Sequence, residues 1–403
     1  MKLAINIGDL RREAKRRIPK FIFDFVDGGA EDEVTLKDNR DQFARWKLIA
    51  RNPVDVSARD LSVELFGQRF AAPFVISPTG LASAARGRAE VALARAAHRL
   101  GVPIAVSTAS SVDIEDLAAC AGGPLWFQLY ILKDRGLTQT LIDRARAAGY
   151  KAIVISVDCP VVGQRERDAR NRLSVPFRPT FAQMIDVLGR TGWLLDFLKH
   201  GPPAPRNFAA LGQNADEITL KLFELLDPAV SWADIAWVRE RWDGPLIIKG
   251  LVSPVDAKLA LSHGADGLVV SNQGGRQLDH AVPSLEALPY INDAVGDRCT
   301  LFCDSGFRRG GDIVKALALG AKAVFLGRAT LFGCAAGGEE GAFRALTILR
   351  DELDRVLAFV GRTSPADIDR SILWDYRQGS PGQGPGLATD SGAGAPEDHA
   401  QSV

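Results

Sequence analysis

Short, continuous runs of apolar residues recur through the middle of the chain, and polar or turn-forming segments separate them. Continuous rather than alternating hydrophobicity indicates strands that are buried on both faces, as in a parallel sheet. The pattern predicts eight such strands, at Phe74–Gly80, Pro103–Thr108, Leu125–Tyr130, Ala152–Asp158, Leu246–Gly250, Gly267–Gln273, Thr300–Gly306 and Ala323–Arg328.

The segments between these runs carry apolar residues at helical spacing. Predicted helices lie at Arg88–Leu100, Leu141–Ala148, Val255–Ser262 and Gly311–Leu319, and a C-cap glycine follows each, at Gly101, Gly149, Gly264 and Gly320. Eight buried strands that alternate with helices predict an α/β fold of the (β/α)8 TIM barrel type. A doubly wound sheet is the alternative, but it requires a glycine-rich phosphate loop after the first strand, and SPTGLASAARG does not have that spacing.

One long insertion interrupts this alternation after the fourth strand. The barrel is predicted to span residues 1–375, with the insertion at about residues 174–230, because Asp158 and Leu246 lie much farther apart than one βα unit requires. Within the insertion, Phe181–His200 is amphipathic. It is interpreted either as a lid that packs on the barrel, which we favour, or as a surface that contacts a membrane or a partner. Residues 376–403 are rich in Gly, Pro, Ser and Ala, which predicts a disordered tail.

Composition narrows the class of protein. Lys plus Arg and Asp plus Glu both number 49, so there is no basic excess of the kind that nucleic-acid binding usually requires. The five cysteines are odd in number and have no metal-like spacing with histidine, which is typical of isolated thiols in a reduced compartment and predicts no metal site. No apolar segment suits a signal peptide or a spanning helix, so we expect a cytoplasmic protein, with peripheral contact to the inner face of the membrane as the variant.

The residues at the ends of the last strands predict an anion site. In a barrel, residues at the C-terminal ends of strands are typically functional, and the loops after strands seven and eight commonly bind phosphate. Here those loops contain Asp304-Ser305-Gly306-Phe307-Arg308-Arg309-Gly310 and Gly327-Arg328. Backbone N–H groups of a glycine-containing turn, with arginine beside them, form a phosphate site. Lys249 ends the fifth strand, where burial requires a negatively charged partner.

Other strand ends predict a site for a carboxylate. The sixth strand leads into SNQGGRQLD, residues 271–279, in which two glycines permit close approach of a ligand to the backbone. Arg276 would then project into the mouth of the barrel and bind a carboxylate through two parallel hydrogen bonds. Gln128 and Tyr130 end the third strand, and Asp158 ends the fourth, shortly before the charged run Arg165–Asp168.

Taken in order, these motifs resemble the family of FMN-dependent 2-hydroxy-acid oxidases and dehydrogenases. The similarity runs from about Asp9 to about Asp369 and is carried by GGAEDE, SPTG, VSTAS, WFQLY, GQRERD, KG, SNQGGRQLD and DSGFRRG. The mandelate-oxidising members are the most similar, and members that act on lactate or glycolate are also similar. The resemblance implies bound FMN, a 2-hydroxy acid that is converted to the 2-oxo acid, and a homotetramer; the aromatic-rich insertion favours an aryl side chain.

The resemblance also implies a role for individual positions. The residues around the flavin ring and ribityl chain would be Pro78, Thr79, Gly80, Ser107, Gln128, Ser156, Lys249, Ser271 and Asp304. Lys249 would stabilise the anionic reduced flavin. The phosphate would lie against Gly306, Arg308, Gly327 and Arg328, and Ser305 and Phe307 would also bind the cofactor. The substrate would lie against Phe25, Tyr130, Arg165 and Arg276. Asp158 would orient the catalytic residue.

The sequence departs from the family at two of these positions. Gln273 stands where the family has its catalytic histidine, and Phe25 stands where the family has a tyrosine. A neutral amide cannot accept a proton near neutral pH, and loss of a general base typically costs about 10²–10⁴ in rate. His280 is the one histidine near the site in sequence, and we expect it to lie on a surface loop.

Three hypotheses follow from this combination. The leading one is an FMN-dependent oxidoreductase that oxidises a 2-hydroxy acid, either aryl or lactate-like. The second is a divergent flavoenzyme that catalyses a different reaction on an α-substituted acid, because the histidine is absent. The third is a non-catalytic protein that binds flavin or a carboxylate.

Overall fold

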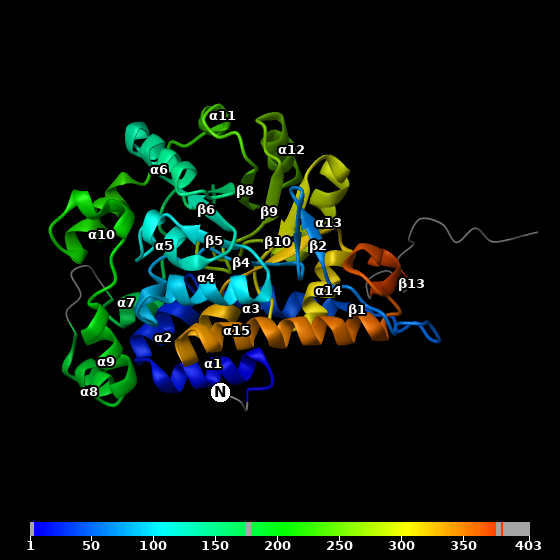
Figure 1. Ribbon diagram of the computed structural model, residues 1–403, viewed down its shortest axis with the longest axis horizontal. Coiled ribbons are helices and arrows are strands. Elements are labelled where there is room, and N and C mark those ends of the chain that lie inside the picture. Colours follow the sequence, from blue (N-terminus) through cyan, green and yellow to red (C-terminus); the bar gives the residue numbers. More distant parts are fainter. Residues whose placement is uncertain (1–3, 174–178, 376–379, 382–403) are drawn as a thin grey trace, which may run out of the picture.

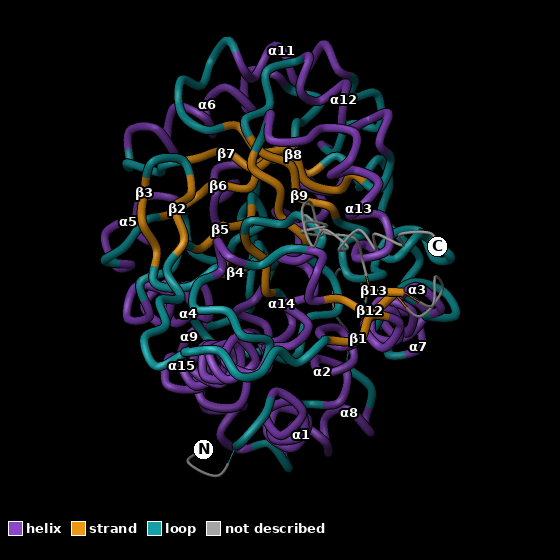
Figure 2. The backbone as a smooth tube through the Cα atoms, turned by 90° about the vertical axis from the view of Figure 1, so that its right-hand side faces the viewer, coloured by secondary structure: helices purple, strands orange, loops and turns teal. Residues whose placement is uncertain are grey.

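Eight parallel strands form a closed barrel in the computed structural model, which describes residues 4–173, 179–375 and 380–381. The strands are β4 (Phe74–Ile76), β5 (Ile104–Ser107), β6 (Leu125–Leu129), β7 (Ala152–Ser156), β8 (Leu246–Leu251), β9 (Gly267–Val270), β10 (Thr300–Cys303) and β11 (Ala323–Leu326). Figure 2 shows β4 to β9 in succession, and β11 pairs with β4 to close the ring. The predicted (β/α)8 barrel is therefore confirmed, and the alternative of a doubly wound sheet is wrong.

A helix follows each strand along the chain. These helices are α4 (Ala89–Leu100), α5 (Ile114–Ala121), α6 (Arg135–Ala147), α11 (Trp232–Arg239), α12 (Pro254–Ser262), α13 (Ser284–Val295), α14 (Gly310–Ala318) and α15 (Arg328–Phe359). All four helices expected from periodicity are present. The four glycines predicted after them have φ values of 79°, 81°, 86° and 109°, the left-handed region that residues with a side chain rarely adopt.

A hairpin closes the N-terminal end of the barrel. It consists of β2 (Val63–Leu65) and β3 (Gln68–Phe70), joined by a turn that carries Phe66. The Phe66 ring lies 6.0 Å from the ring of Trp126 and against Gly267, the first residue of β9. We call this hairpin and the ring of buried side chains above it the barrel floor: Leu65, Phe70, Val75, Ala105, Trp126, Ala152, Val154, Ile247, Val269, Phe302, Ala323 and Phe325.

The N-terminal helices lie against the barrel and reach toward its other end. They are α1 (Ile7–Arg17), α2 (Lys20–Asp27) and α3 (Val34–Asp41), and α1 packs along α15 (Figure 1). A small sheet joins β1 (Trp46–Leu48) to β12 (Leu373–Asp375) and β13 (Ser380–Pro381). Apart from Ser380–Pro381, the tail for which we predict disorder lies outside the described residues.

The segment between β7 and α11, which contains the insertion predicted at about residues 174–230, forms several helices at the side of the barrel. They are α7 (Glu166–Arg170), α8 (Phe181–Leu188), α9 (Thr191–His200), the 3-10 helix η3 (Arg206–Leu211) and α10 (Ala215–Leu225) (Figure 1). Trp193 of α9 is buried, packs edge-on against Phe21 of α2 and donates a 3.0 Å hydrogen bond from Nε1 to the carbonyl of Ala84. Within the described parts of the chain, no helix has both the length and the apolar character that crossing a membrane requires.

Candidate active site

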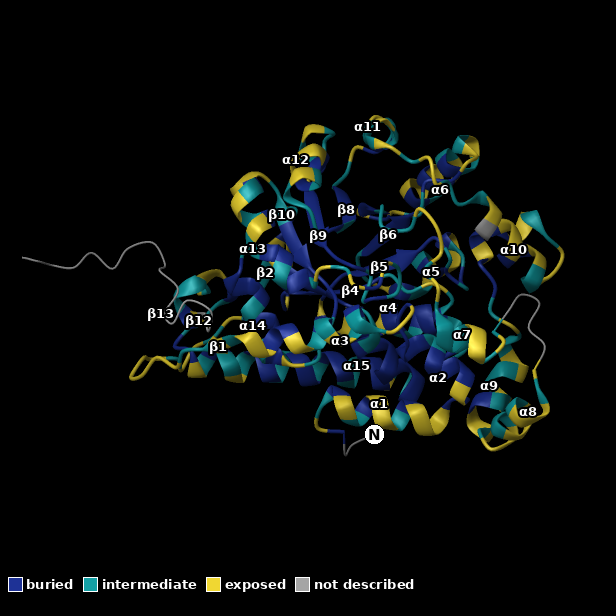
Figure 3. Cartoon of the chain, turned by 180° about the vertical axis from the view of Figure 1, so that it is seen from behind, coloured by how far each residue is buried: buried dark blue, intermediate teal, exposed yellow. Residues whose placement is uncertain are grey.

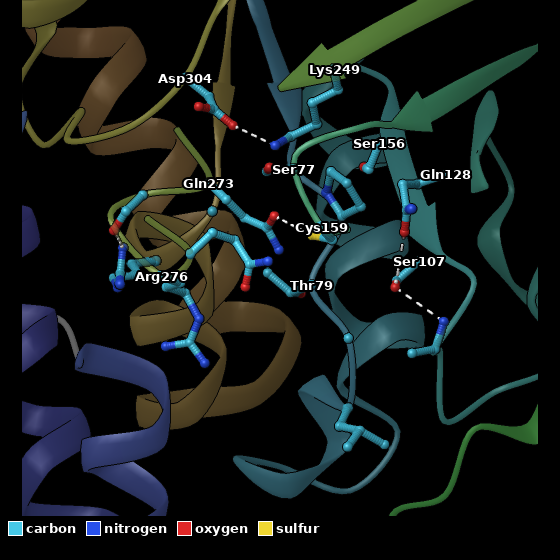
Figure 4. Close-up of a pocket in the computed structure, with 18 of the residues that line it drawn as sticks. Ser77, Thr79, Ser107, Gln128, Ser156, Cys159, Lys249, Gln273, Arg276 and Asp304 are labelled. Carbon is cyan, nitrogen blue, oxygen red and sulfur yellow. Dashed lines mark hydrogen bonds and ion pairs between the residues drawn. The ribbon is translucent and has the colours of Figure 1, made fainter. Parts of the chain in front are cut away.

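A cavity opens at the C-terminal ends of the barrel strands and collects residues from all eight of them or the loops that follow (Figure 4). The predicted residues that line it are Phe25, Pro78, Thr79, Gly80, Ser107, Gln128, Tyr130, Ser156, Arg165, Lys249, Gln273, Arg276, Asp304, Ser305, Gly306, Phe307, Arg308, Gly327 and Arg328. The strand-end positions of the sequence thus converge on one cavity. Ser271 and Asp158 are the predicted residues that lie behind its wall.

A buried ion pair stands in the cavity. The Nζ atom of Lys249 lies 3.0 Å from Oδ2 of Asp304, and both side chains are less than a tenth exposed (Figure 4). Lys249 also donates a 2.9 Å hydrogen bond to Oγ of Ser271, so Ser271 acts by holding the lysine. Burial alone would lower the pKa of Lys249, but the carboxylates of Asp304 and Asp158 more than offset burial and raise it, so the cation persists in the core.

The wall formed by β5 and β6 presents a hydrogen-bond donor without a partner. Ser107 donates a 3.1 Å hydrogen bond from Oγ to Oε1 of Gln128, and its own oxygen accepts the N–H of Ala109 at 3.1 Å. These contacts fix the Gln128 amide with its nitrogen on the other side. That Nε2 atom is buried and has no hydrogen-bond partner within the described structure. Because an unsatisfied buried donor is costly, this atom marks a place for an acceptor on a ligand.

Two arginine side chains and the N-terminus of α15 lie together at one end of the cavity. The Arg328 guanidinium is fixed by the carbonyls of Val26, Gly28 and Gly274 at 2.7–3.0 Å. Burial, with opposing contributions from neighbouring charges, lowers the pKa of Arg328 to about 10, and burial beside Arg328 lowers that of Arg308 to about 9. Gly327, at the N-cap of the long helix α15, supplies no side-chain cap, so this helix end suits an anion.

The neighbouring helix α14 does not contribute to this anion site, which corrects part of the sequence interpretation. Arg309 points away and pairs with Glu352 at 3.0 Å. The N–H groups of Arg308 and Arg309 donate to Oδ2 of Asp312, and the N–H of Gly310 donates to Glu352. The first turn of α14 is therefore already capped by carboxylates of the chain itself.

The guanidinium groups of Arg276, Arg165 and Arg328 lie near one another at the part of the cavity next to Phe25. Arg276 donates from Nη1 to the carbonyls of Phe25 and Gly28 at 2.7 and 2.9 Å, and its guanidinium lies 5.2 Å from the centre of the Phe25 ring. Burial lowers the pKa of Arg276, and the positive charges of Arg165 and Arg328 lower it further, against a smaller opposing contribution from the Asp168 carboxylate. Such crowding of cations in a cavity favours a bound anion.

Gln273 occupies the centre of the mouth in a left-handed conformation, with φ of 53°. Its N–H donates to Ser271 at 3.0 Å, and its Oε1 accepts the thiol of Cys159 at 2.7 Å (Figure 4). A residue that is not glycine adopts this conformation when the surroundings enforce it, often at functional sites. Asp158 makes its side-chain contact to Cys159, at 3.6 Å, so Cys159 stands between the carboxylate and Gln273.

None of the histidines in the described residues lines the cavity. His280 is exposed on its loop, as we expect from the sequence. His200 contacts Asp196 of its own helix, and the His263 ring stacks on Trp232 at 5.7 Å. His98 lies against Gly122 and Gly123. No group of His, Cys, Asp or Glu side chains suited to hold a metal ion occurs among the residues that the structure describes.

Several lining residues are not recognised by sequence reasoning. Cys159 follows Asp158 directly and lies beside Gln273. The sequence predicts an isolated thiol at this position and does not predict that it lines the cavity. Val161 and Val162 are exposed apolar residues at the mouth. Pro205, Thr219, Leu222 and Leu226 reach the cavity from the insertion, and no motif marks them. Tertiary packing brings these four residues to the cavity, and the sequence carries no signal for it.

Comparisons with known proteins identify the family of this chain. A family model described as FMN-dependent dehydrogenase matches residues 14–375. The (S)-mandelate dehydrogenase of Pseudomonas putida is 43% identical over 357 residues, which cover 88% of this chain and 90% of that protein. The L-lactate dehydrogenase of Caulobacter vibrioides (strain NA1000 / CB15N) is 42% identical over 373 residues, which cover 91% of this chain and 96% of that protein.

Solved structures give the same result. A crystal structure described as that of the monotopic membrane protein (S)-mandelate dehydrogenase has a TM-score of 0.90 at 41% identity, covering 93% of this chain and all of that chain. A mandelate oxidase with bound (S)-2-phenylpropionate has a TM-score of 0.76 at 35% identity, covering 90% of this chain and 96% of that chain.

Proposed function

This chain belongs to the family of FMN-dependent dehydrogenases, and from that premise we propose that it oxidises an aryl 2-hydroxy acid to the corresponding 2-oxo acid. The single observation that carries the proposal is the convergence of the predicted flavin, phosphate and carboxylate residues on one cavity. FMN-dependent oxidation of 2-hydroxy acids is the chemistry of its relatives. The aryl side chain and the individual residue roles are our inference.

The cavity residues fit FMN. The unpartnered Nε2 of Gln128 supplies a donor for a polar flavin edge, and the cationic Lys249 supplies positive charge beside it. Arg308, Arg328 and the uncapped start of α15 would hold the phosphate. When bound, FMN supplies the acceptor for the two electrons of the oxidation.

The remaining polar residues would orient the substrate. The buried guanidinium of Arg276, beside Arg165, would bind the carboxylate, and the Tyr130 hydroxyl would contact the substrate hydroxyl. Burial raises the pKa of Tyr130 well above its usual value, so the phenol stays protonated and is able to donate.

An aryl side chain suits the apolar part of the lining. Leu81, Val161, Val162, Leu222 and Leu226 line the cavity. Phe25, which replaces the tyrosine expected from the family, adds an aromatic surface and removes a hydroxyl. An apolar pocket with a few polar groups is typical of sites that bind a small aromatic acid.

Anaerobic mixing of the FMN-loaded protein with a panel of 2-hydroxy acids tests the proposed function. We expect loss of the oxidised flavin absorbance with mandelate-like acids, and a smaller effect with lactate. If neither these acids nor 2-amino acids reduce the flavin, the proposed function is wrong and the non-catalytic binder gains support.

Gln273→His is expected to raise the rate of anaerobic flavin reduction about tenfold or more, since a positioned general base contributes about 10²–10⁴. Gln273→Asn is the matched control, because it keeps a neutral amide and should show no gain. Stopped-flow absorbance measures both variants. An unchanged or lower rate in Gln273→His would instead favour the divergent reaction, in which the amide is adapted to a different α-substituted acid.

We further propose that α8 and α9 contact a membrane surface. Exposed stretches lie on both helices (Figure 3). Their exposed apolar side chains are Phe181, Met184, Ile185, Leu188, Leu195 and Leu198. None of these lines the cavity, whereas the later part of the insertion does. A helix pair with one packed face and one exposed apolar face suits the membrane interface.

Cosedimentation with anionic lipid vesicles tests this contact. Leu195→Asp combined with Leu198→Asp is expected to weaken binding at least about tenfold, because burial of each leucine contributes about 1.5–3 kcal/mol. Phe359→Asp, at an exposed apolar position on α15, is the control and should bind as the unchanged protein does. Equal sedimentation of all three proteins would contradict the proposed membrane contact.

The homotetramer that the resemblance implies stays a prediction. The adjoining surfaces of α12, α13 and the loop between β9 and α13 expose Val255, Leu259, Leu278, Val282 and Tyr290, and we propose this face as the contact between copies. Light scattering of the protein in solution measures the number of copies.

A further inference from the structure

Two polar side chains connect the cavity to a carboxylate behind its wall. The Tyr130 hydroxyl lies 3.7 Å from Sγ of Cys159, and Sγ lies 3.6 Å from Oδ1 of Asp158. Both contacts are within hydrogen-bond range for sulfur. Tyr130 and Cys159 line the cavity, whereas Asp158 lies behind them.

The Asp158 carboxylate lacks a full set of partners. Its Oδ2 is buried and has no hydrogen-bond partner within the described chain. Gly250 packs so closely that a Cβ there would lie 2.5 Å from Cγ of Asp158. Burial raises the pKa of Asp158, the positive charge of Lys249 lowers it, and the negative charge of Asp304 raises it again. This carboxylate therefore accepts a proton more readily than an exposed aspartate does.

We propose that, in the oxidation proposed above, Tyr130 and Cys159 relay the hydroxyl proton of the substrate to Asp158. This inference rests on the proposed function and names the group that accepts the proton in a site without histidine. Tyr130 is the catalytic residue that contacts the substrate. Cys159 and Asp158 act through it.

The proton transfers balance along the relay. The substrate O–H bond breaks and its proton bonds to the Tyr130 oxygen, while the Tyr130 proton moves to Sγ of Cys159. The Cys159 thiol, which rests against Oε1 of Gln273, turns its S–H bond toward Asp158, and that proton moves to Oδ1 of Asp158, which becomes a neutral carboxylic acid. The hydrogen on the α-carbon leaves with the two electrons that FMN accepts in the proposed oxidation, and the carbonyl of the 2-oxo acid forms.

The other groups near the reaction centre are unsuited to accept this proton. Gln273 is a neutral amide, and Lys249 is held as a cation by Asp304. Gln273 instead accepts the Cys159 thiol at 2.7 Å, which fixes the sulfur between the tyrosine and the carboxylate. Burial raises the pKa of Cys159 to about 12, and the negative charge of Asp158 contributes, so the thiol carries its proton and is able to pass it on.

A second cavity provides an outlet for the proton. It lies on the other side of Tyr130 and Cys159, and Gly250, which contacts Asp158, also lines it. Asp227, Trp232 and Asp256 form part of its wall, between the loop that follows α10 and the start of α12. Asp158 itself does not line this cavity, so its proton would reach water there past Gly250 between turnovers.

Variants at Cys159 and Asp158 test the relay in the FMN-loaded protein. We expect Cys159→Ala and Asp158→Asn to slow anaerobic flavin reduction about tenfold or more, while Cys159→Ser, which retains a donor, keeps most of the rate. Cys120→Ser, a half-buried thiol on α5 outside the cavity, is the matched control.

The pH dependence of flavin reduction gives a further prediction. The unchanged protein should lose rate as pH falls through the raised pKa of Asp158, because the protonated carboxyl group cannot accept a proton. Asp158→Asn should not show this loss of rate at low pH.

Repeating the Cys159→Ala substitution in the Gln273→His variant distinguishes a relay from a purely structural role of Cys159. With Gln273→His present, the imidazole accepts the proton directly, so Cys159→Ala should then have little effect. If Cys159→Ala slows both backgrounds equally, or neither, the relay is wrong. If the unchanged protein reduces its flavin with no acid tested, the proposed function itself fails, which is a different result.

Alkylation of Cys159 tests the relay geometry without measuring activity. Iodoacetamide reacts with the thiolate, and peptide mass spectrometry follows Cys159 separately from the other cysteines. Removal of the Asp158 charge should lower the pKa of Cys159, so Asp158→Asn should increase its alkylation about tenfold at alkaline pH. Equal alkylation of Cys159 in both proteins would overturn the coupling on which the relay depends.

Discussion

Arg276→Met is expected to lower kcat/KM for a 2-hydroxy acid by about 30- to 4,000-fold, which corresponds to the roughly 2–5 kcal/mol that truncation of one partner in a buried charge pair costs. Its guanidinium is buried, is fixed by the carbonyls of Phe25 and Gly28, and is crowded by Arg165 and Arg328. A substrate carboxylate relieves that crowding, and methionine fills the volume without providing charge or donors.

Two further variants control this experiment. Arg276→Lys keeps the charge but loses the planar fork of donors, so we expect an intermediate kcat/KM. Arg69→Met, at an exposed position on β3, should match the unchanged protein. Steady-state kinetics with a mandelate-like acid measures all three. A kcat/KM within twofold of the unchanged protein for Arg276→Met would show that the carboxylate binds elsewhere.

Lys249→Met is expected to lower the free energy of unfolding of the FMN-free protein by about 3–5 kcal/mol, because it leaves a buried charge uncompensated. Asp304 lies 3.0 Å from Nζ of Lys249 and is itself buried. We also expect weaker retention of FMN, since the positive charge beside the proposed flavin edge is lost. Urea unfolding measures the stability, and absorbance of the dialysed protein measures bound flavin.

The double variant Lys249→Met with Asp304→Asn separates these two effects. It removes both charges, so most of the stability should return while FMN retention stays low. Lys322→Met, at an exposed lysine that precedes β11, is the control for loss of a lysine as such. If Lys249→Met unfolds at the same urea concentration as the control, the ion pair does not stabilise the core.

The fold was predictable because local and global signals agree in the barrel. Each strand is buried on both faces, so its apolar run is continuous and its end is marked by residues such as Lys249 and Gln128. The left-handed glycines after four helices are a local steric requirement that the sequence displays directly. The order of the strands then follows from the alternation with helices.

The strand pattern predicted the site only where a strand end carries it, and Phe25 and Arg165 were predicted from the family resemblance instead. Arg309 belongs to the same run as Arg308, and nothing local shows that Glu352, far along α15, draws it away. Ser271 follows β9, but its hydroxyl faces Lys249 instead of the cavity. Cys159 and the insertion residues Thr219 and Leu222 reach the cavity through tertiary packing, which leaves no periodic signal in the sequence.

The barrel floor stabilises the fold, whereas the residues proposed to carry the chemistry lie at the C-terminal ends of the strands. Its aromatic side chains, Trp126, Phe302 and Phe325, pack among themselves below the cavity, where Phe325 also forms part of the lining, and the β2–β3 hairpin covers their other side. A change at the mouth, such as glutamine for histidine at position 273, therefore leaves this layer intact. Residues at the C-terminal ends of the strands can therefore change during evolution, and the proton acceptor or the substrate can change with them, while the chain continues to fold.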